Sequence, residues 1–314
     1  MNQAIPMNFQ IRDSQLLNAI YDFDGVIAKR QIKAIFWADK SPRAMEKRLS
    51  KLYQGNYIHW PSLEQRRTYP IPEPIIWLNW RGALYLAGQQ GINIEPPEKE
   101  NENHFRMLEK KLRNEGFHWL REPRWSQLKH DLAIIDTRLW IQASGQQSGG
   151  LTVEEWMKES SFRSNMDYID FPVKDSNGET ITKRRGICPD GYFCVIDEKR
   201  KESGEPFRAR FLMEMDLATH DNPSFGIEKA AAGAAYIKSA EYRKRFGGNS
   251  GRWLVITTGV TRMKNLMSQT RDKALLNSGL FFFTLLENKE KMNFFNSPIW
   301  FQVGSTAPEP LLRT

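Results

Sequence analysis

Three carboxylates, Asp190, Glu214 and Asp216, are the side chains whose types and spacing most suggest chemistry. Glu214 and Asp216 stand two residues apart in an apolar run, so in a strand both side chains point to the same face of a sheet. Asp190 lies near the start of the preceding apolar run, and the polar stretch 197–206 between the runs predicts a strand, a turn and a returning strand. Three carboxylates at one sheet edge can hold a hard divalent cation such as Mg2+ or Mn2+. Solvent-facing strand positions that bind nothing are the alternative.

The residues around these carboxylates predict an α/β domain. A helix over 224–244 carries Lys229 and an alanine-rich stretch. The other expected elements are a helix over 152–159 that begins with the capping box of Thr152 and Glu155, a strand over 252–258, a helix over 261–276 and a strand over 280–285. Strand–helix–strand spacing implies parallel pairing with right-handed crossovers. A hairpin followed by such a crossover gives a mixed sheet with flanking helices.

The N-terminal part of the chain predicts three helices followed by a hairpin, which is the order of a winged helix-turn-helix. The expected helices cover 16–21, 28–37 and 42–53, the expected strands cover 57–60 and 75–80, and a further helix covers 81–88. Ser41 and Pro42 mark a strong helix start. Ala28 stands where a capping Ser or Thr is expected, so the second helix should begin weakly.

Basic residues concentrate on this predicted DNA-binding unit. In the third helix, Arg43, Lys47 and Lys51 are four residues apart, with Arg48 beside them, and a basic face of this kind suits the major groove of double-stranded DNA. The hairpin connection carries Arg66 and Arg67, which we expect to touch phosphates or the minor groove. Residues 1–90 hold 12 Lys and Arg against 7 Asp and Glu, a net charge of +5. A solvated basic face without a partner is the alternative.

The composition and the motifs of the chain favour some classes of function and exclude others. The 314 residues carry a net charge of +8, which favours an anionic partner, nucleic acid before membrane. Two cysteines, Cys188 and Cys194, argue against a disulfide framework and for a reducing, cytoplasmic setting. No apolar run is long enough to span a membrane, and no signal-peptide pattern appears. The five histidines show no zinc spacing, and His220 alone lies near the candidate site. No phosphate-loop or dinucleotide motif supports an ATP-driven enzyme.

Changes in composition predict four segments. They are a DNA-binding domain over 1–95, a helical connector and linker over 96–150, an α/β domain over 151–296 and a tail over 297–314 that leaves the core. In the connector, an apolar stripe of Leu128, Leu132, Ile135 and Leu139 is either core or the seam of a homodimer, and we favour core.

These segments together resemble the replication-relaxation family. The resemblance rests on LLNAIYDFDGVIAKRQIKAIF, MEKRLSKLYQGNYI and WLNWRGALYLA in the first domain and on LKHDLAIIDTRLWI in the middle. In the second domain it rests on RGICPDGYF, FLMEMDLAT, EKAAAGAAYIKSAEY and RWLVITTGVTRMKNLMSQTR. The resemblance implies a winged helix followed by a restriction-endonuclease-like, or PD-(D/E)XK, domain. It also implies action on double-stranded DNA in the replication or relaxation of a plasmid or other mobile element, with replication proteins of that element as partners.

The sequence departs from the nuclease pattern at one decisive position. That pattern would place a lysine at position 216, where this chain has Asp216. Lys229 is the candidate for a migrated lysine, and Glu155 or Glu159 for a further acid. Two hypotheses follow. In the first, the winged helix reads DNA and the nuclease-like domain is a scaffold or a second DNA contact. In the second, the protein is a Mg2+-dependent endonuclease or nickase that uses Asp190, Glu214 and Asp216.

Overall fold

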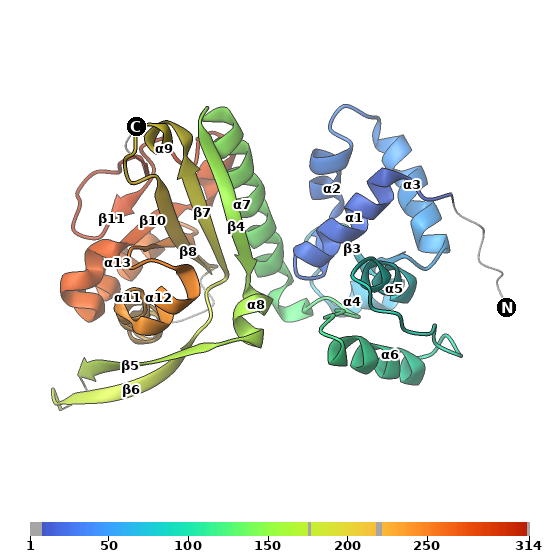
Figure 1. The fold of residues 1–314 in the computed structure, drawn as a ribbon, viewed down its shortest axis with the longest axis horizontal. Helices are drawn as coiled ribbons and strands as arrows, with labels where there is room; N and C mark the ends of the chain where they lie inside the picture. The colour runs from blue at the N-terminus through green and yellow to red at the C-terminus, as the bar shows by residue number, and fades with distance from the viewer. Residues whose placement is uncertain (1–7, 175–176, 218–221, 313–314) are drawn as a thin grey trace. The chain divides into compact units, whose positions relative to one another are not determined.

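The structure of the chain, a computed structural model, describes residues 8–174, 177–217 and 222–312. The chain forms two compact units, Met1–Ile135 and Asp136–Thr314, in a mixed α/β protein (Figure 1). The boundary falls inside one helix, where the sequence predicts a connector. No helix in the described ranges is long and apolar enough to cross a membrane.

Unit 1 is a set of helices around a small antiparallel sheet. Its helices are α1 (Ile11–Asp22), α2 (Lys29–Phe36), α3 (Pro42–Gln54), α4 (Leu63–Thr68), α5 (Trp80–Gln89) and α6 (Glu102–Asn114), and its strands are β1 (Val26–Ala28), β2 (Ile58–His59) and β3 (Ile75–Leu78). The strand order is β1-β3-β2, and both pairings are antiparallel. The expected helices and the β2–β3 hairpin are therefore present, whereas β1 and α4 are additions that the sequence reading missed.

The third helix of unit 1 begins and packs as its residues dictate. The Ser41 hydroxyl accepts a hydrogen bond from the Ala44 backbone N–H at 3.3 Å, and Pro42 occupies the first helical position. The buried stripe of α3 is Met45, Leu49 and Leu52. These side chains join one apolar core with residues of α1, α5 and α6.

Unit 2 is built on a six-stranded mixed sheet. Its strands are β4 (Leu151–Lys158), β7 (Gly191–Asp197), β8 (Arg208–Asp216), β9 (Arg252–Thr257), β10 (Phe281–Leu285) and β11 (Phe301–Gln302), in the order β11-β10-β9-β8-β7-β4. The pairs β4–β7, β7–β8 and β10–β11 are antiparallel, and β8–β9 and β9–β10 are parallel. The predicted hairpin and parallel crossovers are thus confirmed. A separate two-stranded ribbon pairs β5 (Asp167–Lys174) with β6 (Thr180–Ile187).

Helices flank this sheet. They are α7 (Leu128–Gln147), which begins in unit 1, α8 (Glu159–Ser164), α9 (Glu198–Glu202), α10 (Asn222–Phe225), α11 (Ala232–Lys238), α12 (Ala240–Phe246) and α13 (Val260–Ala274), with a π-helical segment at Gly226–Ala231 and 3-10 turns at Leu275–Leu280 and Leu286–Glu290. A further 3-10 turn, Trp125–Gln127, belongs to unit 1. One sheet face packs against α11, α12 and α13 through Leu212, Trp253 and Tyr236. On the other face, Trp140 of α7 meets Phe294, which meets Phe193 of β7.

Three expectations about unit 2 are wrong. Residues 151–158 form strand β4 instead of a helix, because β4 pairs with β7 through a bulge at which Glu155 adopts φ +55°. The polar and glycine-rich stretch 143–150 predicts a flexible boundary, but residues 143–147 are helical and complete α7. Residues 297–312 do not leave the core, since Trp300 is fully buried and β11 pairs with β10.

The stripe on α7 is buried as favoured. Leu128, Leu132 and Ile135 are 1%, 3% and 2% exposed, which makes them core residues in the described chain instead of an open dimer seam. Leu139 is only partly buried.

Candidate functional site

Asp190 and Glu214 come together because β7 and β8 pair. Asp190 immediately precedes β7, and its backbone N–H donates to the Met213 carbonyl at 3.0 Å. Its carboxylate turns back across β8 and accepts a hydrogen bond from the Met215 N–H at 2.7 Å, beside Glu214. Both carboxylates are 6% exposed. The hairpin that the sequence predicts therefore fixes two buried acids on neighbouring strands.

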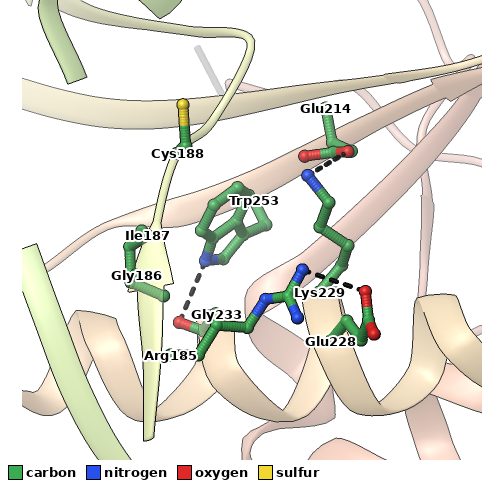
Figure 2. Close-up of a pocket in the computed structure, with 9 residues that line it drawn as sticks. All are labelled: Arg185, Gly186, Ile187, Cys188, Glu214, Glu228, Lys229, Gly233 and Trp253. Carbon is green, nitrogen blue, oxygen red and sulfur yellow. Dashed lines mark hydrogen bonds and ion pairs between the residues drawn. The ribbon is translucent and has the colours of Figure 1, made fainter. Parts of the chain in front are cut away.

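Lys229 supplies the positive charge of this cluster. Its Nζ lies 2.7 Å from Glu214 Oε1, as the dashed line in Figure 2 shows. Burial alone would lower the pKa of Lys229, but the charges of Glu214 and Asp190 outweigh it and raise that pKa, so the ammonium stays protonated at neutral pH. The structure thus brings the predicted migrated lysine to the predicted acid.

The local backbone explains how Lys229 reaches the sheet. It lies in the π-helical segment Gly226–Ala231, and π-helical turns occur frequently at functional sites. The alanines at 230–232 are buried against the sheet. Gly233 lets the indole of Trp253 approach closely, since a Cβ there would stand 2.8 Å from the ring, and Trp253 Nε1 donates to the Gly233 carbonyl at 3.0 Å.

A small cavity of about 60 Å3 opens beside Glu214 and Lys229. Across it, Arg185 of β6 forms a 2.9 Å ion pair with Glu228, the residue before Lys229 (Figure 2). Glu228 and Lys229 therefore tie the same π-helical turn to two different strands. Sequence reasoning missed this second pair, because the ribbon that carries Arg185 was not predicted.

Cys188 also lines the cavity. Burial, reinforced by the nearby charge of Glu159, raises the pKa of its thiol to about 11. The side chain is therefore a neutral thiol at physiological pH and a poor nucleophile.

Asp216 belongs to a different group of side chains. Arg262 of α13 holds it in a bidentate ion pair, with Nη2–Oδ1 and Nε–Oδ2 distances of 2.8 Å. The Thr257 hydroxyl donates to Asp216 Oδ2 at 2.9 Å. The side chain is 3% exposed. The structure thus brings Asp190, Glu214 and Lys229 together, and gives the predicted third acid a partner on α13.

The fit of the predicted Mg2+ or Mn2+ can be judged from the oxygen atoms. Asp190 accepts from a backbone N–H, Glu214 from an ammonium and Asp216 from a guanidinium. Within the described ranges, no three His, Cys, Asp or Glu side chains are placed to hold a metal ion. As arranged, these carboxylates do not fit a divalent cation.

The other acids that the resemblance suggested have local partners. Glu159 of α8 pairs with Arg163 one turn later, with an Nε–Oε1 distance of 3.0 Å. Glu155 lies at the β4 bulge and accepts from the Tyr192 hydroxyl at 3.3 Å. His220 lies outside the described residues.

Unit 1 presents the predicted basic face on α3. Arg43, Lys47 and Lys51 are exposed, and none of the three forms an ion pair with a residue that the structure describes. They lie away from the buried stripe of the helix. Three cations in one row, free of internal carboxylates, form a surface that an anion can approach.

Arg48 does not share that face. Its Nε donates to Asp13 Oδ1 at 2.7 Å, its Nη2 contacts the other oxygen of Asp13, and Asp13 is fully buried on α1. The hydrogen bond with Asp13 raises the pKa of Arg48. The guanidinium ties α3 to α1, and we therefore leave it out of the proposed DNA contacts.

Arg66 and Arg67 lie on α4 instead of on a hairpin loop. The helix starts at Ser62, whose hydroxyl accepts from the Gln65 N–H at 3.1 Å, and it buries none of its residues. Both arginines are exposed, although Arg66 Nε donates to the Pro61 carbonyl at 3.2 Å. The β2–β3 connection thus carries its arginines on a short surface helix.

The two clusters are chemically distinct. The site on unit 2 is buried and internally paired, whereas the face on unit 1 is exposed and cationic. Comparison of the chain with protein-family models, with curated proteins and with solved structures gave no match.

Proposed function

We propose that unit 1 is a winged helix-turn-helix that binds double-stranded DNA through α3. The order α1, β1, α2, α3, β2, β3 with a three-stranded antiparallel sheet supports this fold. In helix-turn-helix proteins, the helix that follows the turn lies in the major groove. Here that helix is α3, with α4 at the position of the wing.

The single observation that carries the proposal is the row Arg43, Lys47 and Lys51. These cations are exposed on one face of α3 while Met45, Leu49 and Leu52 anchor the other face in the core. Phosphate contacts by Lys and Arg supply most of the affinity in protein–DNA complexes. Arg66 and Arg67 on α4 are the proposed secondary contacts.

The proposed role is that of a DNA-binding protein of the replication-relaxation type, acting with replication proteins of a plasmid or other mobile element. Unit 2 is then the restriction-endonuclease-like part. Its antiparallel β4-β7-β8 followed by parallel β9 supports this assignment, as does Asp190 before β7 with Glu214 on β8. In this role unit 2 serves as a scaffold or as a second DNA contact.

The test is duplex binding by fluorescence anisotropy across a salt series. Arg43→Ala/Lys47→Ala/Lys51→Ala should weaken binding at least tenfold and reduce the slope of log K against log salt by roughly 2 to 3, about 0.9 for each lost phosphate contact. The matched control is Lys99→Ala/Lys110→Ala/Lys111→Ala, which removes the same charge from exposed positions of unit 1 outside α3. Equal losses in the two triple variants would show that net charge, and not α3, governs binding.

The second candidate function is a Mg2+- or Mn2+-dependent endonuclease or nickase. The convergence of Asp190, Glu214 and Lys229 favours it, whereas the pairing of Asp216 with Arg262 weighs against it. The test is supercoiled plasmid incubated with and without metal, beside an Asp190→Ala variant. Nicking that requires metal and disappears in the variant would establish this function in place of the scaffold role.

A further inference from the structure

The Asp190–Glu214 pair poses an electrostatic problem that the fold must solve. Two carboxylates, each 6% exposed, lie on adjacent strands of the sheet. A buried carboxylate is strongly unfavourable unless a counter-charge and hydrogen bonds compensate it. In many proteins with paired acids, a divalent cation provides that counter-charge.

Lys229 already provides it here. Its ammonium is in direct contact with Glu214, at 2.7 Å, and Asp190 is the second carboxylate that acts on its charge. Figure 2 shows the side chain extending from the π-helical turn across the cavity wall to Glu214. The alanine-rich segment packs that turn against the sheet, and the Arg185–Glu228 pair ties it to strand β6 of the ribbon.

While Lys229 occupies Glu214 Oε1, the remaining oxygen atoms do not make a metal site by themselves. Asp190 Oδ2 is bound by the Met215 N–H at 2.7 Å, and Asp216 is turned to Arg262. A magnesium ion, which needs near-octahedral oxygen coordination, would have to displace the partly buried ammonium of Lys229 to reach Glu214 Oε1. The acids that the resemblance assigned to a metal therefore already hold a different cation.

We propose that Lys229 Nζ is the permanent cation of this site, standing in for a divalent metal between Glu214 and Asp190. The wild-type protein accordingly holds no Mg2+ or Mn2+ there and needs none to fold or to bind DNA. Removing the ammonium releases the buried Glu214 Oε1 next to Met215, whose N–H holds the Asp190 carboxylate, and so creates a cation site. Lys229 is in this sense an intramolecular replacement for the metal.

The experiment is a titration of the full-length protein with Mn2+ alone, followed by electron paramagnetic resonance and by calorimetry. Lys229→Met removes the charge at similar volume, and Lys229→Arg keeps it. The double variant Lys229→Met/Asp190→Asn also removes one of the two buried acids. Lys238→Met, at an exposed position of α11, is the matched control.

We expect no Mn2+ binding at this site by the wild type, Lys229→Arg or Lys238→Met. Lys229→Met should gain one site, at least tenfold tighter than any residual binding, and the double variant should lose it. Mn2+ bound by the wild type and lost in Asp190→Asn would overturn the proposal. Failure of Lys229→Met to gain a site would overturn it as well. Since no DNA is present, these outcomes are independent of the role proposed for α3, and the wild-type result stands even if Lys229→Met does not fold.

Discussion

Glu214 and Asp216 stand two residues apart on the same strand, yet they belong to different ion pairs. Strand alternation fixes which face of the sheet a side chain leaves, and both leave the face covered by α11 and α13. The partner is decided by which helix passes over each position. Lys229 reaches Glu214 from the π-helical turn, and Arg262 reaches Asp216 from α13.

The Asp216–Arg262 pair should be important for stability. Asp216 is 2% and Arg262 15% exposed in their side chains. We expect Arg262→Ala to lower the free energy of unfolding by about 3 kcal/mol, because it leaves a buried carboxylate without its main counter-charge. Arg271→Ala, which removes the 66% exposed partner of Asp272 on the same helix, should cost less than about 0.5 kcal/mol. Urea unfolding checks both values, and equal values would refute the structural role of Asp216.

At the start of α2, the buried side chain of Gln31 takes the place of the capping Ser or Thr that was expected at position 28. Ala28 has no capping side chain, and Gln31 Oε1 accepts from the Ala28 N–H at 2.9 Å while its Nε2 donates to the Leu132 carbonyl at 3.0 Å. The side chain is 1% exposed. The predicted weakness at Ala28 is therefore compensated three residues later.

Gln31→Ala should consequently destabilise the protein by roughly 1 to 3 kcal/mol, since it leaves the Ala28 N–H without this buried acceptor and removes one donor from the Leu132 carbonyl. Gln65→Ala is the matched control, because Gln65 makes the same backbone bond to Ser62 N–H, at 2.9 Å, in an exposed setting. That change should cost no more than about 0.5 kcal/mol. Thermal and urea denaturation measure the difference, and a cost for Gln31→Ala as small as the control would contradict the role given to its side chain.

At the scale of elements, the sequence predicted the strands and helix starts that depend on neighbouring residues. The strands β7, β8, β9 and β10 are short, apolar and rich in β-branched or aromatic residues, and each was expected within a few residues of its observed bounds. The start of α3 was found because Ser41 and Pro42 act within one turn. Their signals come from neighbouring residues.

The elements that were missed depend on distant partners. Residues 151–158 contain a capping-box pattern, but pairing with β7 overrides it, and the bulge at Glu155 hides the strand period. The sequence of β6 is polar along much of its length, since residues 180–184 are exposed on both faces of the ribbon. The Lys229–Glu214 contact depends on a π-helical turn that no residue pattern marked. Tertiary packing, and not propensity, selects these features.

At the scale of the molecule, unit 2 buries several tyrosine hydroxyls and a cysteine thiol. Burial raises the pKa of Tyr192 and Tyr242, and burial with a hydrogen bond to Asp167 raises that of Tyr236. Burial also raises the pKa of the Cys188 thiol to about 11. Each group keeps its proton in the folded chain at a pH where the unfolded chain has lost it.

Unit 2 should therefore lose stability in alkaline solution. A raised pKa contributes stability that is fully present below the unfolded-state value and disappears as the pH rises through the folded-state value. The unfolded-state values are 9.0 for the thiol and 10.0 for the phenols, so the midpoint of thermal unfolding should fall steeply above about pH 9. Calorimetry from neutral pH upward tests this, together with near-ultraviolet tyrosinate absorbance, in which the share of Tyr192, Tyr236 and Tyr242 should appear only on unfolding. Ionisation of all nine tyrosines in the folded protein would contradict it.

The boundary between the units lies between Ile135 and Asp136, inside the 20-residue helix α7. A chain severed there would leave one fragment with unpaired helix carbonyls and the other with unpaired N–H groups. Asp136 would also part from the upstream turn while still bound to Lys289, at 2.7 Å. The boundary between the two compact units is therefore a poor place to cut the chain. A truncation or a domain exchange that keeps both units intact should therefore carry the whole of α7 with one of them.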